Sequence, residues 1–471
     1  MAEAGAHRTL RGWGGGIGAY AVVAAPEDGE RAQAAIARLR DSGAGDRDGA
    51  IARGLGRSYG DAAQLSGGLV LEMTRCKGFA LDDAQGTVTA QGGVTIGELL
   101  RALVPAGWSL PVVPGTQHVT IAGAIASDVH GKNHATAGTF GAHVHALGLL
   151  TAADEVLELA PGRGDGLFEA TLGGMGLTGV ILWARFALAP VSGCRLEVDT
   201  DRVESVDGAL AALSAPGGAY RVAWLDLLGS RPGRGVVTRA AHAAGGDSAG
   251  AGRSGDGERL SGDGGSGAAG GATVRARVTV PARWPAGVLR ASTVRAFNEL
   301  RLRQAPRRER GRPEGFGAHM FPLDALGSWP RLYGRQGLIQ YQFVVPHGRE
   351  HVLHAVIEGL RRARVPCFLA VLKDLGAAND APLSFPLAGW TLALDLPRAA
   401  PGIVAMLDGF DELVAQAGGR VYLTKDARLR PEATAAMYPR LGQWRAARER
   451  ADPNRLWRSD LARRTDLIGA R

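Results

Sequence analysis

The chain of 471 residues holds only three cysteines, Cys76, Cys194 and Cys367, and they form no CxxC pair. Neither a disulfide framework nor a cysteine zinc site is indicated, and we expect no bound metal. No apolar run approaches the roughly 20 residues that span a bilayer, and the first residues lack the apolar core of a secretory signal. We therefore expect a protein of the cytoplasm, or one bound peripherally at a membrane surface.

Zinc fingers, RNP motifs and long basic helices are also missing, so the sequence does not support a nucleic-acid partner. The net charge is nevertheless +8, from 54 basic and 46 acidic residues. This balance favours anionic partners, either phosphate-bearing ligands or anionic lipid, but for charge alone a solvated arginine-rich surface is the simpler interpretation. With this length and 45% hydrophobic residues, the chain can form two ordinary globular domains.

Three glycine-rich stretches lie in the first 180 residues: 50–61 (AIARGLGRSYGD), 114–144 and 173–179 (GGMGLTG). In the second, Thr120 can cap a short helix over residues 121–126, whose free N–H groups suit an anion such as a pyrophosphate. Taken alone, residues 114–144 fit a solvated surface loop equally well. Successive N–H groups in three such turns indicate one extended cofactor. The spacing is not GxGxxG, so the evidence for a Rossmann domain is weak.

The segment up to about residue 190 alternates short helices and strands. Helical spacing predicts a helix over residues 30–41, and a capping box of Thr95 and Glu98 predicts another through residue 103. Strand-like runs cover residues 67–73, 87–91 and 180–182. The glycine turns lie between these elements, which predicts an α+β cofactor domain.

The composition changes after residue 194. Residues 243–272 are nearly all Gly, Ala, Ser, Asp and Arg, which predicts a disordered insertion because such a run buries little apolar area. The arginine-rich run 301–312 predicts a second mobile loop. It either contacts lipid headgroups or is a solvated charge cluster.

Residues 337–346 alternate as a strand, with Gln340 and Gln342 on one face. The two amides predict a hydrogen-bonding floor for a ligand, or else a polar face that meets water. A helix over 350–364 and strands over 368–375 and 390–396 follow, which predicts a substrate-binding sheet with helices on one face. Residues 418–426 predict a final strand that ends in the charged pair Lys425 and Asp426.

Several strings carry a family resemblance: ARGLGRSYGD (52–61), PGT (114–116), IAGAIASDVHGKNH (121–134), GGMGLTG (173–179) and SDLARR (459–464). Together they resemble the vanillyl-alcohol-oxidase type of flavoprotein, which has a PCMH-type FAD-binding domain. LIQYQFVVP (338–346), APLSFPLAGW (381–390) and YLTKD (422–426) are most similar to the branch of that family that oxidises a polyprenylphosphoryl ribose. The resemblance covers nearly the whole chain except the glycine-rich insertion.

The resemblance implies an α+β fold in two parts. Residues 6–193 plus 420–471 would form the FAD-binding domain, and residues 194–419 would form an inserted substrate domain of antiparallel sheet flanked by helices. Members that attach the flavin covalently carry a histidine at the position of Arg57, so FAD is expected to be bound non-covalently. The residues implied to contact FAD are Ala52, Arg53, Gly54, Leu55, Gly56, Arg57, Ser58, Tyr59, Gly60, Asp61, Gly115, Thr116, Thr120, Ile121, Ala122, Gly123, Ser127, Asp128, Val129, His130, Ile181 and Tyr422.

The implied reaction is oxidation of the ribose 2′-hydroxyl, with a hydride passing to the flavin and a base accepting the proton. Lys425 and His130 are the two catalytic candidates. Lys425 would orient the hydroxyl and stabilise negative charge on the flavin, or act as the base if its pKa is lowered. Tyr59, Lys132, Gln340, Gln342 and Lys373 would bind the sugar and the phosphate. Three positions depart from the branch, since Met320, Thr391 and Ala393 stand where Tyr, Asn and Cys are found.

The resemblance also implies partners. A polyprenylphosphoryl pentose would be the substrate, a separate NAD-dependent reductase would complete an epimerisation that supplies the arabinose donor for cell-wall arabinan, and peripheral membrane contact is expected. Two alternatives stay open. One is a soluble alditol or aldonolactone type of sugar oxidase that uses oxygen, and the other is a non-catalytic protein that binds anionic polymers or membranes through its arginines.

Overall fold

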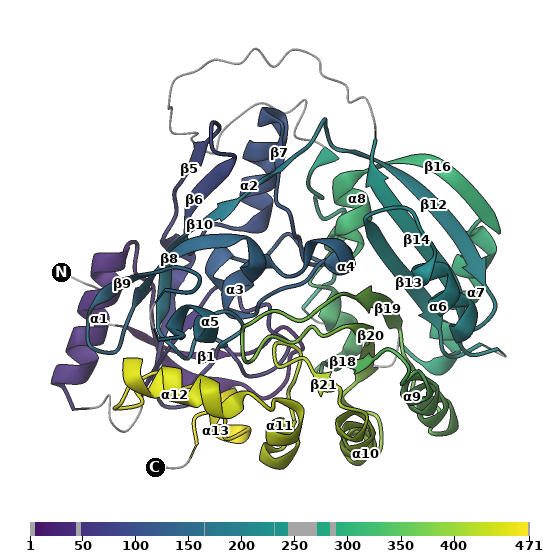
Figure 1. The fold of residues 1–471 in the computed structure, drawn as a ribbon. Coiled ribbons are helices and arrows are strands. Elements are labelled where there is room, and N and C mark those ends of the chain that lie inside the picture. The colour runs from purple at the N-terminus through teal and green to yellow at the C-terminus, as the bar shows by residue number, and fades with distance from the viewer. Residues whose placement is uncertain are drawn as a thin grey trace.

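The computed structural model describes residues 5–43, 49–163, 165–229, 231–243, 271–282 and 289–469. Sheets formed by the first 190 residues lie beside a large sheet formed by the middle of the chain (Figure 1). The α+β class predicted from the sequence is therefore confirmed. None of the helices in the described ranges is both long and apolar enough to cross a bilayer.

The first sheet has the strand order β1 (Ala6–Leu10), β2 (Ala19–Ala24), β4 (Leu69–Glu72), β3 (Ala50–Arg53), and its last three strands are parallel. Helix α1 (Gly29–Asp41) connects β2 to β3 and begins at Asp28, whose carboxylate accepts a hydrogen bond from the Arg31 amide at 2.7 Å. The helix predicted over residues 30–41 is thus confirmed. The parallel strand β3 ends at the first glycine turn, which places that turn at the edge of the sheet.

The second sheet is antiparallel, in the order β5 (Phe79–Asp82), β6 (Thr87–Gln91), β10 (Val180–Ala187), β8 (Val144–Leu150), β9 (Val156–Leu159). Helices α2 (Ile96–Leu103) and α3 (Ile121–Ala126) bury Leu99, Leu100, Ile121 and Ile125 in one core cluster with these strands. The predicted caps are confirmed, since Thr95 forms the capping box with Glu98 and the Thr120 hydroxyl accepts from the Gly123 amide.

The third sheet has eight strands among the described residues, and neighbouring strands are antiparallel throughout. Its order is β16 (Arg308–Gly315), β12 (Arg195–Val203), β14 (Arg234–His242), β13 (Tyr220–Asp226), β19 (Leu369–Leu375), β20 (Gly389–Pro397), β18 (Leu338–Pro346), β21 (Arg420–Val421). The strands predicted in the middle of the chain are confirmed as β18, β19 and β20.

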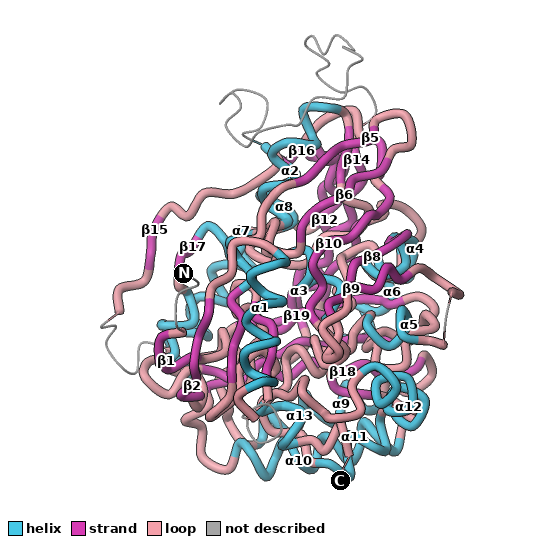
Figure 2. Tube along the Cα trace, turned by 90° about the vertical axis from the view of Figure 1, so that its left-hand side faces the viewer, coloured by secondary structure: helices cyan, strands magenta, loops and turns pink. Residues whose placement is uncertain are grey.

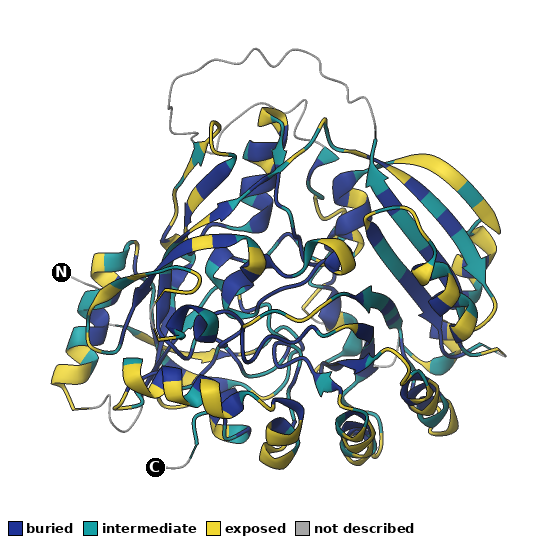
Figure 3. Ribbon diagram, viewed as in Figure 1, coloured by how far each residue is buried: buried dark blue, intermediate teal, exposed yellow. Residues whose placement is uncertain are grey.

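Helices cover both faces of this sheet. Helices α6 (Val206–Ser214), α9 (His351–Arg362) and α10 (Ile403–Gln416) pack on one face and turn their exposed residues outward (Figure 3). Helix α7 (Ala291–Gln304) packs on the other face, where Leu302 contacts Trp224 and Val236. The prediction of helices on one face only is therefore wrong for α7, whose few apolar residues gave a weak helical pattern.

The end of the chain returns to the part of the molecule formed by the first 190 residues. Helices α11 (Pro431–Met437), α12 (Leu441–Ala451) and α13 (Asp460–Arg464) lie with α10 along the same side of the protein (Figures 1 and 2). The two-residue strand β21 pairs with β18, so the final segment also extends the large sheet. The remaining short strands and α-helices are β7 (Trp108–Ser109), β11 (Ala189–Pro190), β15 (Val278–Thr279), β17 (Leu326–Gly327), α4 (His134–Ala137), α5 (Leu167–Thr171) and α8 (Phe316–Met320).

Two sequence predictions in this part of the chain are wrong. Residues 301–312 do not form a mobile loop, because they end α7 and begin β16, where Arg310 pairs with Asp201 at 2.7 Å. Residues 418–426 are a strand only over Arg420–Val421, after which Tyr422 and Lys425 belong to a hydrogen-bonded turn. The predicted insertion 243–272 lies mostly outside the described residues, although Ala272 at its end is buried in the core.

Candidate active site

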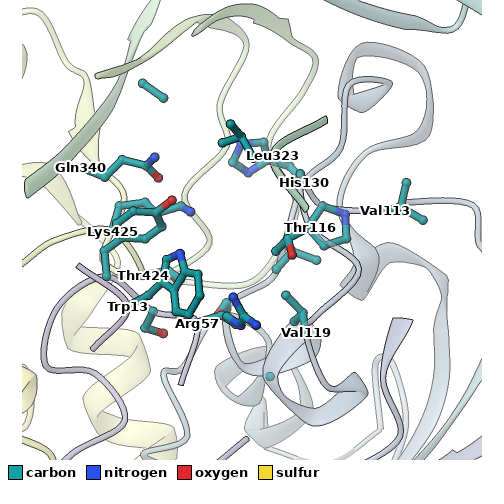
Figure 4. A pocket seen from close by; sticks show the side chains of 18 of the residues that line it. Trp13, Arg57, Val113, Thr116, Val119, His130, Leu323, Gln340, Thr424 and Lys425 are labelled. Atoms are coloured by element: carbon teal, nitrogen blue, oxygen red, sulfur yellow. The ribbon is translucent and has the colours of Figure 1, made fainter. Parts of the chain in front are cut away.

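A cavity of about 550 Å³ lies between the glycine turns and the large sheet (Figure 4). Its volume is in the range usual for cofactor and ligand sites. Val113, Thr116 and Val119 lie on one side of it, and Gln340 and Lys425 lie on the other (Figure 4). All three glycine turns contribute to the lining, through residues 52–59, through 113–116, 119, 120, 122, 123, 126, 127 and 129–132, and through 175, 176 and 179–181.

The first glycine turn is held in one shape by its neighbours. Arg53 at the end of β3 donates to the carbonyls of Ala63 and Arg11, each at 2.8 Å. A Cβ on Gly54 would lie 2.3 Å from the Thr120 hydroxyl oxygen, so the first and second turns touch here and only glycine fits. Gly56 has φ +62°, in the left-handed region that glycine adopts without strain.

Arg57 lies at the centre of this turn and points toward the cavity (Figure 4). Its guanidinium carbon lies 3.7 Å from the centroid of the Trp13 ring, and its Nε is buried without a hydrogen-bond partner. Burial lowers the pKa of Arg57, an effect that Asp324 opposes. An arginine keeps its charge under these conditions, so an unsatisfied cationic donor faces the cavity.

The large sheet forms the opposite wall through aligned side chains. Gln340 on β18 lies across from Asp395 on β20, and Gln342 lies across from Ala393, as alternate residues facing the same way. Gln342 donates through Nε2 to the Thr391 hydroxyl at 3.2 Å and contacts the His130 ring nitrogen Nε2 at 3.1 Å. Gln340, Gln342 and Ala393 all line the cavity, so the two amides do not face water.

Lys425 follows β21 and enters the cavity from the chain's last segment. Its amide donates to the Tyr422 carbonyl at 2.9 Å, and its ammonium lies 4.2 Å from the centroid of the Tyr59 ring. Burial lowers the pKa of Lys425 to about 8, and the Asp395 carboxylate partly opposes this change. A lysine with this pKa is partly neutral at physiological pH and can accept a proton.

His130 is held neutral. Burial, with the nearby charges of Lys373, His134 and Lys425, sets the pKa of His130 well below its usual value. Gln342 donates to its Nε2, which leaves the proton on Nδ1, and Nδ1 is buried without a partner. In this tautomer the ring offers a donor rather than a free acceptor, so His130 is the poorer base of the two candidates.

Two further lysines make the cavity positive. Burial lowers the pKa of Lys132 to about 8 and that of Lys373 to about 7. The Lys132 ammonium donates to the His319 carbonyl, and the Lys373 ammonium lies 3.5 Å from the Gly131 carbonyl. A bound phosphate would raise both pKa values, because an opposite charge favours the ammonium form.

Known proteins resemble this chain, one of them over nearly its whole length. The family described as an FAD binding domain matches residues 20–160. A decaprenylphosphoryl-β-D-ribose oxidase from Mycolicibacterium smegmatis is 36% identical over 468 residues, which are 98% of this chain and 98% of that protein. The chain belongs to the decaprenylphosphoryl-β-D-ribose oxidase family. It is an FAD-dependent oxidoreductase with a PCMH-type FAD-binding domain.

Two other relatives show how the similarity is distributed. An uncharacterised Streptomyces coelicolor protein is 37% identical over 79% of this oxidase and 100% of its own length. An alditol oxidase from a Streptomyces species is 29% identical over 144 residues, which are 30% of this chain and 34% of that protein. Full-length similarity is thus shared with the ribose oxidase, whereas the alditol oxidase matches only part of the chain.

The cavity of this oxidase fits FAD. The Arg57 Nε and the His130 Nδ1 are buried polar atoms without partners, and the three glycine turns bring backbone to the cavity wall. No atom lies within 4 Å of the position that a Cβ on Gly115 would take, so the space beside this lining residue is open. Arg57 has no ring nitrogen that could form a covalent bond to the flavin, as the histidine of the covalent members does. This residue type therefore favours the prediction that FAD is bound non-covalently.

Four residues implied to contact FAD contribute nothing to the cavity lining. Gly60 packs against the Asp426 carbonyl, and Asp61 forms an ion pair with Arg464 at 2.8 Å. Ile121 is fully buried in the core. Asp128 is also fully buried and accepts hydrogen bonds from Ser384, Asn379 and the Gly141 amide. The structure brings the other implied cofactor, substrate and catalytic residues together around the one cavity.

Sequence reasoning missed several cavity residues. Trp13 stacks under Arg57, and its amide donates to the Ser58 carbonyl at 2.7 Å. Asp324 accepts hydrogen bonds from the Thr116 hydroxyl at 2.7 Å and from the Gln117 amide at 2.8 Å. Trp13 stands in the run GWGGG at 12–16, a local glycine signal, whereas Asp324 had no local signal because its partners are distant in sequence.

Proposed function

We propose that the protein oxidises the 2′-hydroxyl of decaprenylphosphoryl-β-D-ribose to a 2′-keto intermediate, the first half of an epimerisation to the arabinose donor for cell-wall arabinan. The observation that carries this proposal is the cavity itself, where Lys425 and the amides of Gln340 and Gln342 face the glycine turns. The full-length similarity to the ribose oxidase supports the same substrate.

Lys425 is the residue that accepts the hydroxyl proton in this proposal. Its burial supplies the lowered pKa that a lysine base needs, whereas the Nε2 of His130 is occupied by Gln342. FAD, when bound, supplies the hydride acceptor. Tyr59, Gln340 and Gln342 hold the sugar in this arrangement, and His130 adds an Nδ1 donor.

Lys132 and Lys373 bind the substrate phosphate in this proposal. Both ammonium groups are buried at the cavity wall, where Glu314 also lies and raises the pKa of Lys132. We further propose the division into a cofactor domain (6–193 plus 420–471) and a substrate domain (194–419), because the cavity lies between the glycine turns of the first and the sheet of the second.

Anaerobic mixing with substrate tests the function directly. Decaprenylphosphoryl-β-D-ribose is expected to bleach the visible absorbance of the bound flavin, and xylitol or another alditol is expected to leave it unchanged. Bleaching by alditols alone would support a soluble sugar oxidase instead. A colourless protein that takes up no FAD would contradict both and would favour a non-catalytic binder of anionic polymers.

We also propose that the cavity opens toward a membrane surface beside α7. Its lining reaches Phe297, Arg301 and Trp224, and the guanidinium of Arg301 lies 4.9 Å from the centroid of the Trp224 ring. Phe297 and Leu300, one turn apart on α7, are 44% and 54% exposed and form an apolar surface beside this part of the lining. A lipid chain that leaves the cavity here would pass directly into a bilayer. A separate NAD-dependent reductase would then receive the keto product.

Replacing Leu300 by glutamate is expected to weaken binding to vesicles that contain anionic lipid by about tenfold, because burying a leucine side chain is worth about 1.5–3 kcal/mol. Vesicle flotation measures the bound fraction. Val404→Glu is the matched control, because Val404 is 51% exposed on α10, which packs on the opposite face of the sheet. Equal binding of both variants and the unchanged protein would contradict membrane contact through α7.

A further inference from the structure

Asp395 is a buried carboxyl group that holds Gln340, a residue of the cavity lining. It lies on β20 directly across from Gln340 on β18, and it is 1% exposed. Its Oδ1 accepts a hydrogen bond from the Gln340 Nε2 at 2.5 Å, and its Oδ2 is buried without any partner. A buried carboxylate with one hydrogen bond is costly, so a purely structural residue at this place would more often be apolar.

The groups that face Asp395 come from several elements. Lys425 follows β21, Tyr59 lies in the first glycine turn, Tyr333 ends the 3₁₀ helix Trp329–Tyr333, and Cys367 precedes β19. Among these, Lys425 is the cation. The tyrosines and the cysteine are neutral, because burial raises the pKa of each of them.

The charges of Asp395 and Lys425 depend on one another. Burial raises the pKa of Asp395 to about 7, and the Gln340 hydrogen bond and the Lys425 charge oppose this rise. The Asp395 carboxylate in turn raises the pKa of Lys425. Each group therefore favours the charged form of the other.

We propose that Asp395 is a positioning residue that fixes the Gln340 carboxamide and balances the charge that Lys425 gains on accepting a proton. By accepting from Nε2, Asp395 leaves the Gln340 amide oxygen as the acceptor at the cavity wall. Among the described residues, the Asp395 carboxylate is the negative charge that raises the pKa of Lys425. The charge balance rests on the proposed role of Lys425 as base, whereas the coupling of the two groups does not.

The variant Asp395→Asn separates charge from shape. Asparagine keeps an acceptor for Gln340 and removes the negative charge. The pH midpoint of Lys425 is expected to fall by about one unit, because an opposite charge nearby shifts a pKa by about 1–3 units. Trace acetylation of the holoenzyme across pH, followed by mass spectrometry of the Lys425 peptide, measures this midpoint. Lys132 is an internal control, since its pKa depends on burial and on Glu314.

A second variant approaches the same coupling without changing Asp395. Gln340→Met removes the donor that stabilises the carboxylate, so Asp395 is protonated over a wider pH range and the Lys425 midpoint again falls, by less than in Asp395→Asn. Asp226→Asn is the matched control, because Asp226 is a fully buried strand aspartate that pairs with Arg234 and does not act on Lys425. This control is expected to lower thermal stability and to leave the Lys425 midpoint unchanged.

The midpoint of flavin reduction against pH provides a readout in turnover, and it is expected to move downward with the labelling midpoint. Unchanged midpoints by both measurements, in variants with a native melting curve, would overturn the proposal. Failure of decaprenylphosphoryl ribose to bleach the flavin would overturn the proposed function instead, and the labelling shift would still be observed. The two failures are therefore distinguishable.

Discussion

Replacement of Lys425 by arginine is expected to slow reduction of the bound flavin by substrate about 10²–10⁴-fold, the usual contribution of a general base. Arginine keeps a positive charge beside Tyr59, but its guanidinium does not lose a proton in proteins. The variant therefore removes the base and preserves the cation. Stopped-flow absorbance under anaerobic conditions measures the rate constant.

The unchanged protein is expected to show the matching pH dependence. Because burial lowers the pKa of Lys425 to about 8, the neutral amine increases as the pH rises through 8. The rate constant should rise about tenfold per pH unit below the pKa and level off above it. Lys77→Arg is the control, since Lys77 is half exposed and pairs with Glu98. A rate that falls through pH 8, or an arginine variant with full activity, would assign Lys425 an electrostatic role instead.

Replacement of Asp452 by alanine is expected to lower the free energy of unfolding by about 3–5 kcal/mol, since it leaves a buried arginine uncompensated. Asp452 and Arg448 pair at 2.6 Å with side chains that are 0% and 1% exposed. The Asp452 carboxylate also accepts from the amides of Leu456 and Trp457, at 2.7 and 2.8 Å. Chemical denaturation followed by tryptophan fluorescence measures the loss.

The same helix supplies the control for this prediction. Arg450 pairs with Asp165 at 2.7 Å, but both side chains are about half exposed. Asp165→Ala is expected to change the free energy of unfolding by less than about 1 kcal/mol, as for other exposed ion pairs. Arg448 also donates to the Leu177 carbonyl in the third glycine turn at 3.1 Å, so Asp452→Ala should also weaken retention of FAD. Equal losses of unfolding free energy in Asp452→Ala and Asp165→Ala would contradict the expectation that the buried ion pair contributes more than the exposed one.

The parts of the fold that depend on neighbouring residues could be predicted from the sequence. The capping box of Thr95 and Glu98, the cap at Thr120 and the alternating strand of residues 337–346 are local patterns, and each is present in the structure. The convergence of three glycine turns on one cavity also followed from composition, because glycine is needed wherever backbone approaches closely.

Features that depend on distant contacts could not be predicted. Residues 301–312 look like a solvated loop because they are rich in arginine, but pairing with β12 makes residues 308–315 a strand. Asp395 is an ordinary strand residue until β18 places Gln340 beside it, 55 positions away in sequence. Asp61 and Asp128 lie within or next to glycine-rich stretches of the sequence, yet neither carboxylate faces the cavity. Asp61 pairs with Arg464, and Asp128 accepts hydrogen bonds from Ser384 and Asn379.

The turn that carries Lys425 is fastened on both sides by main-chain atoms. The Tyr422 amide donates to the Gln342 carbonyl at 2.9 Å, and the Tyr59 amide donates to the Thr424 carbonyl at 3.0 Å. Since every residue except proline can make such bonds, mutation of side chains does not abolish them. Substitutions in the cavity walls can consequently leave the spacing between Lys425, Gln342 and the first glycine turn unchanged.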